Sequence, residues 1–195
     1  MILDKILLFL GYIFVGGGIK YVDQAFDEFI FPKKKALVIG LICGVIGGMM
    51  IAADGPTSII FLSILLGLVI TRKIDNNAFI TATLICIFLI IMRVIFSPVT
   101  ISIDTQIIPV IFLVSGAILD EIGNDMADKG MFKGFLEKFF LYRCVVKVVM
   151  FLMVISGFFE LYYFFAFLSF DITYTLVEEW SWKVKEGKYR FKLLT

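Results

Sequence analysis

The chain of 195 residues contains no histidine and only three cysteines, Cys43, Cys86 and Cys144. Without histidine there is no Ser-His or Cys-His nucleophile pair, and no zinc or haem site that uses a histidine ligand. The cysteines form no CxxC pair and no disulfide framework. Each lies in or beside an apolar run, so we interpret all three as small packing residues.

Charge is also scarce, because charged residues make up 18% of the chain and hydrophobic residues 61%, with a mean hydropathy of +1.00. Soluble domains are about a quarter charged and about half apolar. The charge that is present is clustered between long apolar runs, which is typical of transmembrane helices. A formal net charge of +1 gives no electrostatic basis for binding nucleic acid. The composition predicts a multi-pass protein of the cell membrane whose surroundings are membrane lipid.

The apolar runs predict an all-α, polytopic bundle of about six transmembrane helices over residues 1–178. These helices are expected at about 6–22, 36–53, 58–70, 78–96, 107–119 and 144–170. We interpret the first as a retained helix, because no small-residue cleavage site follows it. Gly40 and Gly44 have the GxxxG spacing that lets helices pack closely. The mixed segment 131–143 favours an amphipathic helix at the membrane interface.

The segment 179–195 is expected to form a separate basic tail. Trp180, Trp182 and Val184 alternate with polar residues, and Glu186-Gly187 would form a two-residue turn. This pattern predicts a β-hairpin. Its aromatic face would lie at the membrane–water boundary.

Lysine and arginine are absent from the connections between helices 2 and 3 and between helices 4 and 5. They occur in loops 1–2, 3–4 and 5–6, which the positive-inside rule places in the cytoplasm. With six helices the basic tail would lie outside, against the same rule. A break near Gly157, or a re-entrant segment, would reverse the tail, and both interpretations remain open.

Carboxylates gather in the same cytoplasmic loops, and the densest run is the stretch 120–130, expected to be a loop. Without histidine or cysteine beside them, they are hard oxygen ligands of the kind Mg²⁺ prefers. The candidate metal ligands are Asp23, Asp27, Glu121, Asp125 and Asp128. The candidate diphosphate-binding residues on the same side are Lys34, Lys35, Arg72 and Lys73. The alternative is that these charges serve as helix caps and topology signals, as expected for Asp75-Asn76-Asn77.

Three stretches together resemble the UbiA-type intramembrane prenyltransferases. They are Asp23-Gln24-Ala25-Phe26-Asp27, Phe31-Pro32-Lys33 and the stretch 121–130, with four helices between the first and the last. The resemblance implies a Mg²⁺-dependent transferase that binds a prenyl diphosphate between two aspartate-rich cytoplasmic loops. The chain departs from that family in having Ile19-Lys20 where the first motif opens with Asn-Asp, and about six helices in place of about nine.

Arg93 and Glu160 stand apart because both lie within apolar runs. At 1.5 Å per residue, Arg93 is about 22 Å along its helix from Ala78, and Glu160 is about 20 Å from Lys147. Both helices start on the same side, so the two charges would reach a similar depth. An unpaired charge in lipid costs several kcal/mol. We therefore predict an intramembrane ion pair between them.

Two functions remain open at this point. The first is an enzyme that acts on a lipid diphosphate, with Mg²⁺ between the acidic loops. The second is a non-enzymatic membrane scaffold or small transporter subunit, for which no cofactor is needed and the carboxylates are structural.

Overall fold

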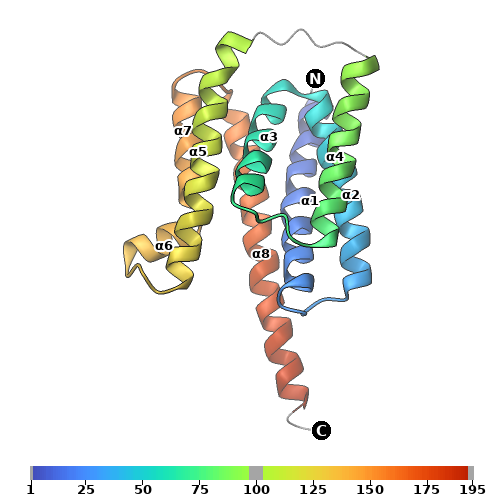
Figure 1. The fold of residues 1–195 in the computed structure, drawn as a ribbon, viewed down its shortest axis with the longest axis vertical. Coiled ribbons are helices and arrows are strands. Elements are labelled where there is room, and N and C mark those ends of the chain that lie inside the picture. Colours follow the sequence, from blue (N-terminus) through green and yellow to red (C-terminus); the bar gives the residue numbers. More distant parts are fainter. Residues whose placement is uncertain (1, 97–102, 193–195) are drawn as a thin grey trace. The chain divides into compact units, whose positions relative to one another are not determined.

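A computed structural model describes residues 2–96 and 103–192, which form eight helices and no strand (Figure 1). The helices are α1 (Ile2–Phe26), α2 (Lys33–Ala53), α3 (Gly55–Ile70), α4 (Asn77–Phe96), α5 (Ile103–Asp128), α6 (Phe135–Leu141), α7 (Cys144–Ile155) and α8 (Leu161–Lys192). The all-α prediction is confirmed, whereas the expected number of about six helices is not. The connection expected between the helices at 78–96 and 107–119 lies outside the described residues over 97–102, and its last residues are helical, because α5 begins at Ile103.

Four of the described helices are long and apolar enough to cross a membrane, namely α1, α2, α4 and α5. Two more, α3 and α7, are apolar but shorter, at 16 and 12 residues. These lengths and compositions agree with a multi-pass membrane protein.

The chain folds as two compact units, and each is described by itself. The first unit contains α1, α2, α4 and the part of α8 from Ala166 onward. The second contains α3, α5, α6, α7 and the first turn of α8.

In the first unit, α2 packs closely against α4 through glycines. A Cβ on Gly44 would lie 2.6 Å from the carbonyl oxygen of Ala82, and Gly40 faces Ala78 in the same way at 3.4 Å. Because the contacts advance in the same direction along both helices, α2 and α4 are parallel. The predicted role of Gly40 and Gly44 in close helix packing is confirmed.

The helix α8 runs parallel to α1 in this unit. Gly16 lies against the backbone of Phe170, Lys20 pairs with Glu178, and further along Glu28 pairs with Lys185. Since α1 is antiparallel to α2, the carboxyl ends of α1 and α8 lie at the same end as the amino ends of α2 and α4. This end carries the basic run that opens α2, and we call it the basic end of the first unit.

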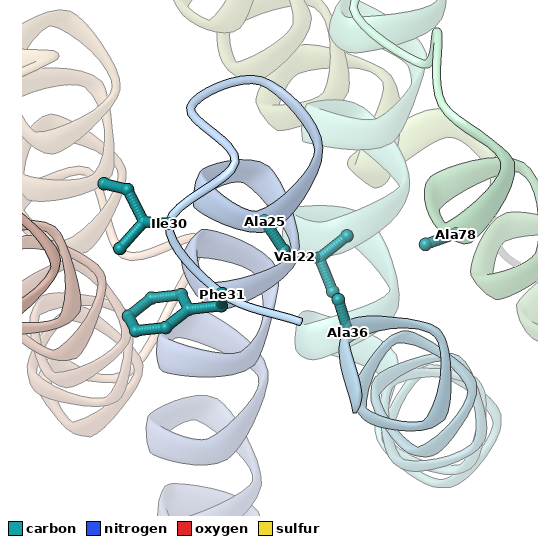
Figure 2. Close-up of a cluster of buried hydrophobic side chains, with 6 residues drawn as sticks. All are labelled: Val22, Ala25, Ile30, Phe31, Ala36 and Ala78. Carbon is teal, nitrogen blue, oxygen red and sulfur yellow. The ribbon is translucent and has the colours of Figure 1, made fainter. Parts of the chain in front are cut away.

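A cluster of buried apolar side chains packs the basic end of the first unit (Figure 2). Its members come from α1, the α1–α2 connection, α2 and α4. They are Val22, Ala25, Ile30, Phe31, Ala36 and Ala78. The ring of Trp180 in α8 stacks on Phe31 with 4.9 Å between ring centroids, so α8 is held against this cluster.

In the second unit, α5 is parallel to α3 and antiparallel to α7. A Cβ on Gly67 of α3 would touch Ala117 of α5, and Gly116 faces Val149 of α7. The first turn of α8 returns along α7, since the rings of Phe151 and Phe164 lie 5.6 Å apart. The carboxyl ends of α3 and α5 and the amino end of α7 therefore meet at one end, the basic end of the second unit.

Three helices of the second unit end in the same way, with a left-handed residue after the last turn. These residues are Arg72 after α3, Gly130 after α5 and Gly157 after α7. In each case the next N–H returns to a carbonyl in the preceding turn, as in a Schellman motif, for example Met131 N to Met126 O at 3.0 Å. The prediction of a loop over the stretch 120–130 is wrong, because α5 continues through it to Asp128.

Gly157 also interrupts the single helix expected over 144–170. With φ of +78°, it separates α7 from α8, so the alternative of a break near Gly157 is confirmed. Glycine adopts this conformation without the steric cost that a Cβ would bring.

The β-hairpin predicted in the tail is wrong, because α8 continues to Lys192. The alternation that suggested a strand also fits a helix: Trp180 stacks on Phe31, and Val184, four residues on, packs against the same cluster. No proline interrupts this stretch, and Gly187 weakens a helix by only about 1 kcal/mol. Tertiary packing of one helical face therefore overrides the local turn signal.

Candidate functional site: polar clusters at the basic end of each unit

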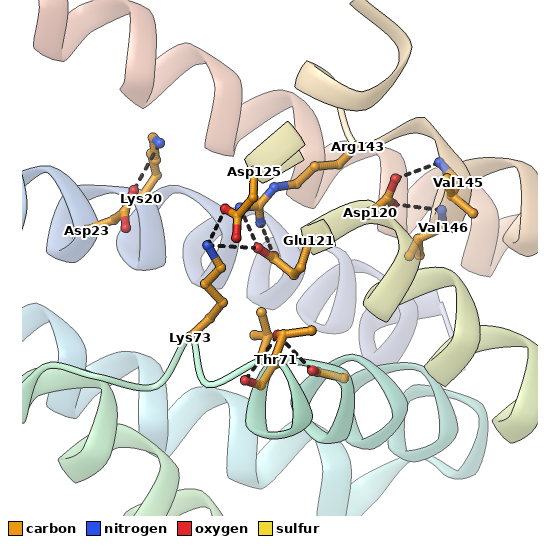
Figure 3. A network of polar contacts seen from close by, with 12 residues as sticks. Lys20, Asp23, Thr71, Lys73, Asp120, Glu121, Asp125, Arg143, Val145 and Val146 are labelled. Carbon is orange, nitrogen blue, oxygen red and sulfur yellow. Dashed lines mark hydrogen bonds and ion pairs between the residues drawn. The ribbon is translucent and has the colours of Figure 1, made fainter. Parts of the chain in front are cut away.

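The first polar cluster surrounds Lys20, a buried cation in α1 (Figure 3). Its Nζ lies 2.9 Å from Asp23 of the same helix and 2.8 Å from Glu178 of α8. The ring of Tyr174 lies 4.8 Å from the ammonium group. The side chain of Lys20 is only 9% exposed, so its charge is stabilised by two carboxylates and an aromatic face.

Asp23 and Asp27, the first predicted pair of metal ligands, have different surroundings. Asp23 is bound to Lys20, whereas Asp27 is exposed just beyond the end of α1. The pKa of Asp27 is raised to about 6. The largest cause is partial loss of hydration, followed by the charge of Asp23, a hydrogen bond to Asp23, and the charge of Asp75. Three carboxylates thus create a local negative potential that Lys20 offsets only in part.

Next to this pair, Gln24 places a polar group in the interior of the first unit. Gln24 is 3% exposed, and its Oε1 has no hydrogen-bond partner among the described residues. A buried oxygen without a hydrogen-bond donor is costly.

The second polar cluster is centred on Glu121, which is buried in α5 (Figure 3). Arg143, in the turn between α6 and α7, approaches both carboxylate oxygens, with Nη1 2.8 Å from Oε1 and Nη2 3.3 Å from Oε2. Lys73, just after α3, lies 4.0 Å from Glu121 and donates to Asp125 at 2.6 Å. The cluster therefore joins α3, α5 and the start of α7.

Asp120, the neighbour of Glu121, caps α7 from another helix. Its two carboxylate oxygens accept hydrogen bonds from the backbone N–H groups of Val145 and Val146, at 2.9 and 2.8 Å. These donors have no partner within α7, and a carboxylate at a helix amino end also interacts favourably with the helix dipole. Asp120 is therefore a structural group in this fold.

Lys73 is a predicted diphosphate-binding residue, and the structure places it between two carboxylates. Burial lowers its pKa, but the hydrogen bond to Asp125 and the charges of Asp125 and Glu121 outweigh burial, so the net pKa is raised above its ordinary value. Lys73 consequently carries a full positive charge at physiological pH.

The structure thus pairs several predicted metal ligands with cations. Glu121 and Asp125 bind Arg143 and Lys73, and Asp23 binds Lys20. The other predicted residues at the two basic ends, Asp27, Asp128, Lys34, Lys35 and Arg72, are exposed. Across the described residues, no group of three or more His, Cys, Asp or Glu is arranged to hold a metal ion.

The expected partners Arg93 and Glu160 belong to different units, so their pairing stays a prediction. Arg93, near the end of α4, donates from Nε to the carbonyl oxygen of Ala52 at 3.0 Å. Glu160 lies in the turn that precedes α8. At the other end of α4, the predicted helix cap is confirmed, because Asn76 Oδ1 accepts a hydrogen bond from Phe79 N at 3.0 Å.

Four residues that sequence reasoning did not assign to a site are central to these clusters: Lys20, Asp120, Arg143 and Glu178. Lys20 carried a usable signal, because an ionisable residue inside an apolar helix requires a partner. Asp120 belongs to the acidic stretch 120–130, but nothing in the sequence indicated its partners, and Arg143 carried no signal, since its partner comes from another helix.

Comparison with protein-family models, with curated proteins and with solved structures gave no match to this chain.

Proposed function

We propose that this chain is a non-enzymatic multi-pass membrane protein, a scaffold or small transporter subunit, whose cytoplasmic carboxylates hold its helices together. The observation that carries this proposal is the burial of Glu121 between Arg143 and Lys73. A Mg²⁺ ion would have to displace these cations from the carboxylates that bind them. Asp120 is likewise committed to capping α7.

The proposed orientation places the basic end of each unit in the cytoplasm of a cell membrane. In the second unit this end carries Arg72, Lys73 and Arg143, and in the first it carries the run Lys33–Lys35. Within the first unit, α8 runs parallel to α1 and ends at the basic end, where α2 begins. The basic segment after Glu178 then lies in the cytoplasm, which removes the conflict that six helices created.

A thermal-shift experiment on the detergent-purified protein tests the structural role of the second cluster. Wild type and Asp125→Asn are heated with and without Mg²⁺ and a prenyl diphosphate, and the exposed Asp128→Asn serves as the matched control. We expect that Mg²⁺ and the prenyl diphosphate together do not raise the unfolding temperature of the wild type through Asp125, so that wild type and Asp125→Asn respond to the ligands alike. Stabilisation by Mg²⁺ and diphosphate together, lost in Asp125→Asn but kept in Asp128→Asn, would contradict the proposal.

The second candidate function is the Mg²⁺-dependent prenyl-diphosphate enzyme that the UbiA-type resemblance implies. One observation favours it: Asp27 lies in a negative potential, created by the charges of Asp23 and Asp75. Mg²⁺ usually takes one or two carboxylates and completes its shell with water and phosphate oxygens. The exposed Lys34 and Lys35 would be available to bind the diphosphate.

The variant Asp27→Asn, measured with the same ligands, separates the two candidates. If the first cluster binds Mg²⁺ and a diphosphate, wild type is stabilised by the two together and Asp27→Asn is not. If both proteins respond to neither ligand, the enzyme hypothesis is excluded for this cluster.

A further inference from the structure

The short helix α6 lies crosswise to α5 and α7 at the basic end of the second unit (Figure 1). One side of it packs on α5, where the ring of Phe140 lies against Gly123. The other side exposes large apolar side chains, with Phe135 78% and Leu136 51% exposed. Met131, just before the helix, is 63% exposed.

Exposed cations flank these apolar side chains. Lys129, Lys133 and Lys138 all lie within ten residues of one another, and their side chains are exposed. Two carboxylates, Asp128 and Glu137, are interspersed, so the segment is basic rather than purely cationic. The nearby Arg143 is bound to Glu121 and contributes little free charge.

Apolar side chains bordered by lysines are the pattern of a helix that rests in the headgroup region of a bilayer. The apolar side chains enter the acyl boundary, and the lysine stems extend so that their ammonium groups reach the phosphates. Attraction to an anionic leaflet is worth about 1 kcal/mol per basic residue near the surface.

We propose that the segment 129–142, which we call the α6 surface, binds anionic phospholipid headgroups of the leaflet at the basic end of the second unit. Phe135 and Leu136 insert into the leaflet, while Lys129, Lys133 and Lys138 contact the lipid phosphates. This inference rests on the proposed membrane orientation and is independent of whether the carboxylates bind Mg²⁺.

The position of α6 favours lipid over a soluble protein as the occupant. The helix lies at the ends of α5 and α7, two apolar helices whose ends reach the level of the headgroups in that orientation. A helix of seven residues also offers little area for a protein partner. A standard protein interface buries about 800 Å² on each side.

The test uses the full chain in lipid nanodiscs, with Phe135→Trp as a fluorescent reporter and Trp180 and Trp182 replaced by phenylalanine. Phe135 is mostly exposed, and its ring lies 5.9 Å from that of Phe139, a contact that the aromatic ring of tryptophan can also make. The discs contain phosphatidylcholine with a minor fraction of brominated lipid, either phosphatidylglycerol or phosphatidylcholine. Bromine quenches tryptophan only at close range, so the degree of quenching reports which lipid is next to α6.

We expect brominated phosphatidylglycerol to quench Trp at position 135 about twofold more than brominated phosphatidylcholine. The excess should disappear when Lys129, Lys133 and Lys138 are all replaced by glutamine. It should persist when Lys33, Lys34 and Lys35 are replaced instead, which removes the same charge from the first unit.

Equal quenching by the two lipids would overturn the proposed preference for anionic headgroups. Absence of quenching by either lipid would place α6 in water or against a protein, and would overturn the proposal entirely. Excess quenching that survives the triple glutamine substitution would show that the named lysines do not select the lipid.

Discussion

Adjacent residues on one helix serve different partners in this protein, as Asp120 and Glu121 show. A helix turns by about 100° per residue, so Asp120 faces the amino end of α7 while Glu121 faces Arg143 and Lys73. Each carboxylate is buried, and each has partners that offset the loss of hydration. At this scale the contacts of Asp120 and Glu121 are explained by the stability of the second unit.

The pair between Glu121 and Arg143 is expected to contribute to stability in proportion to its burial. Glu121→Gln should lower the free energy of unfolding by about 1–3 kcal/mol, less than for a fully buried pair because Arg143 is partly exposed. Arg143→Gln should cost a similar amount, and the double variant less than the sum. Unfolding by denaturant in detergent micelles measures all three.

The exposed Asp128→Asn is the control for this cycle and should change stability by less than about 0.5 kcal/mol. Strictly additive costs in the double variant would show that Glu121 and Arg143 do not interact in the folded protein.

Asp27 is expected to make the stability of the protein depend on pH. Its pKa is raised to about 6 in the fold, above the value near 4 of an unfolded aspartate, so the folded state holds the proton more tightly. The stability that its protonation provides is present below about pH 4 and is lost as the pH rises through 6. The groups that face Asp27 in this window are Asp23, Asp75 and Lys20.

Asp27→Asn should therefore raise the midpoint of thermal unfolding at pH 7.5. The midpoint of this variant should also vary less than that of the wild type between pH 4 and 6. Asp128→Asn should keep the pH dependence of the wild type. A lower midpoint for Asp27→Asn at pH 7.5 would contradict the repulsion that the carboxylate cluster implies.

At the scale of the elements, glycines decide where helices end and how closely they approach. Gly157 is left-handed and ends α7, whereas Gly44 is helical and brings α2 against the backbone of α4. The sequence suggested a break near Gly157 only as an alternative, because residues 144–170 form one mostly apolar run. The run of glycines in α2, by contrast, already predicted close packing.

Replacing Gly157 by alanine should destabilise the protein by about 1–2 kcal/mol, since a Cβ in the left-handed region clashes with its own backbone. Gly187→Ala in α8 is the matched control and should stabilise by up to about 1 kcal/mol. A Cβ added at either glycine would meet no neighbouring atom within 4 Å, so the comparison isolates the backbone conformation. Equal effects of the two substitutions on the unfolding midpoint would contradict a break at Gly157.

Gly44 and Gly47 offer a second matched pair, in α2. A Cβ on Gly44 would lie 2.6 Å from the carbonyl oxygen of Ala82, whereas one on Gly47 would meet nothing within 4 Å. Gly44→Ala should cost about 1–3 kcal/mol through forced separation of α2 and α4. Gly47→Ala should be neutral or stabilising. A neutral Gly44→Ala, in the same unfolding assay, would show that α2 and α4 are not in close contact.

At the scale of the whole molecule, the sequence predicted the helical class and the positions of most apolar helices. It misplaced the end of α5 and missed the helical continuation through residue 192, because both depend on packing against other helices. Gly130 was a usable signal for the end of α5, since a glycine commonly follows the last helical turn.

The candidate site was predicted only as a set of residue types. The carboxylates of the stretch 120–128 were identified, but their partners were not, because Arg143 and the N–H groups of Val145 and Val146 belong to later elements. Charge pairing between distant helices leaves no local pattern in the sequence. The same limit hid the contact between Lys20 and Glu178.

The direction of α8 places the basic segment after Glu178 on the same side as Lys33–Lys35, and the proposed membrane orientation depends on it. The most direct test is single-cysteine labelling in cells, with Cys43, Cys86 and Cys144 replaced by serine and one cysteine introduced at an exposed position. Lys34→Cys and Glu186→Cys are compared using a membrane-impermeant maleimide. Both should react only after the membrane is permeabilised; reaction of Glu186→Cys in intact cells, with Lys34→Cys protected, would contradict the proposed direction of α8.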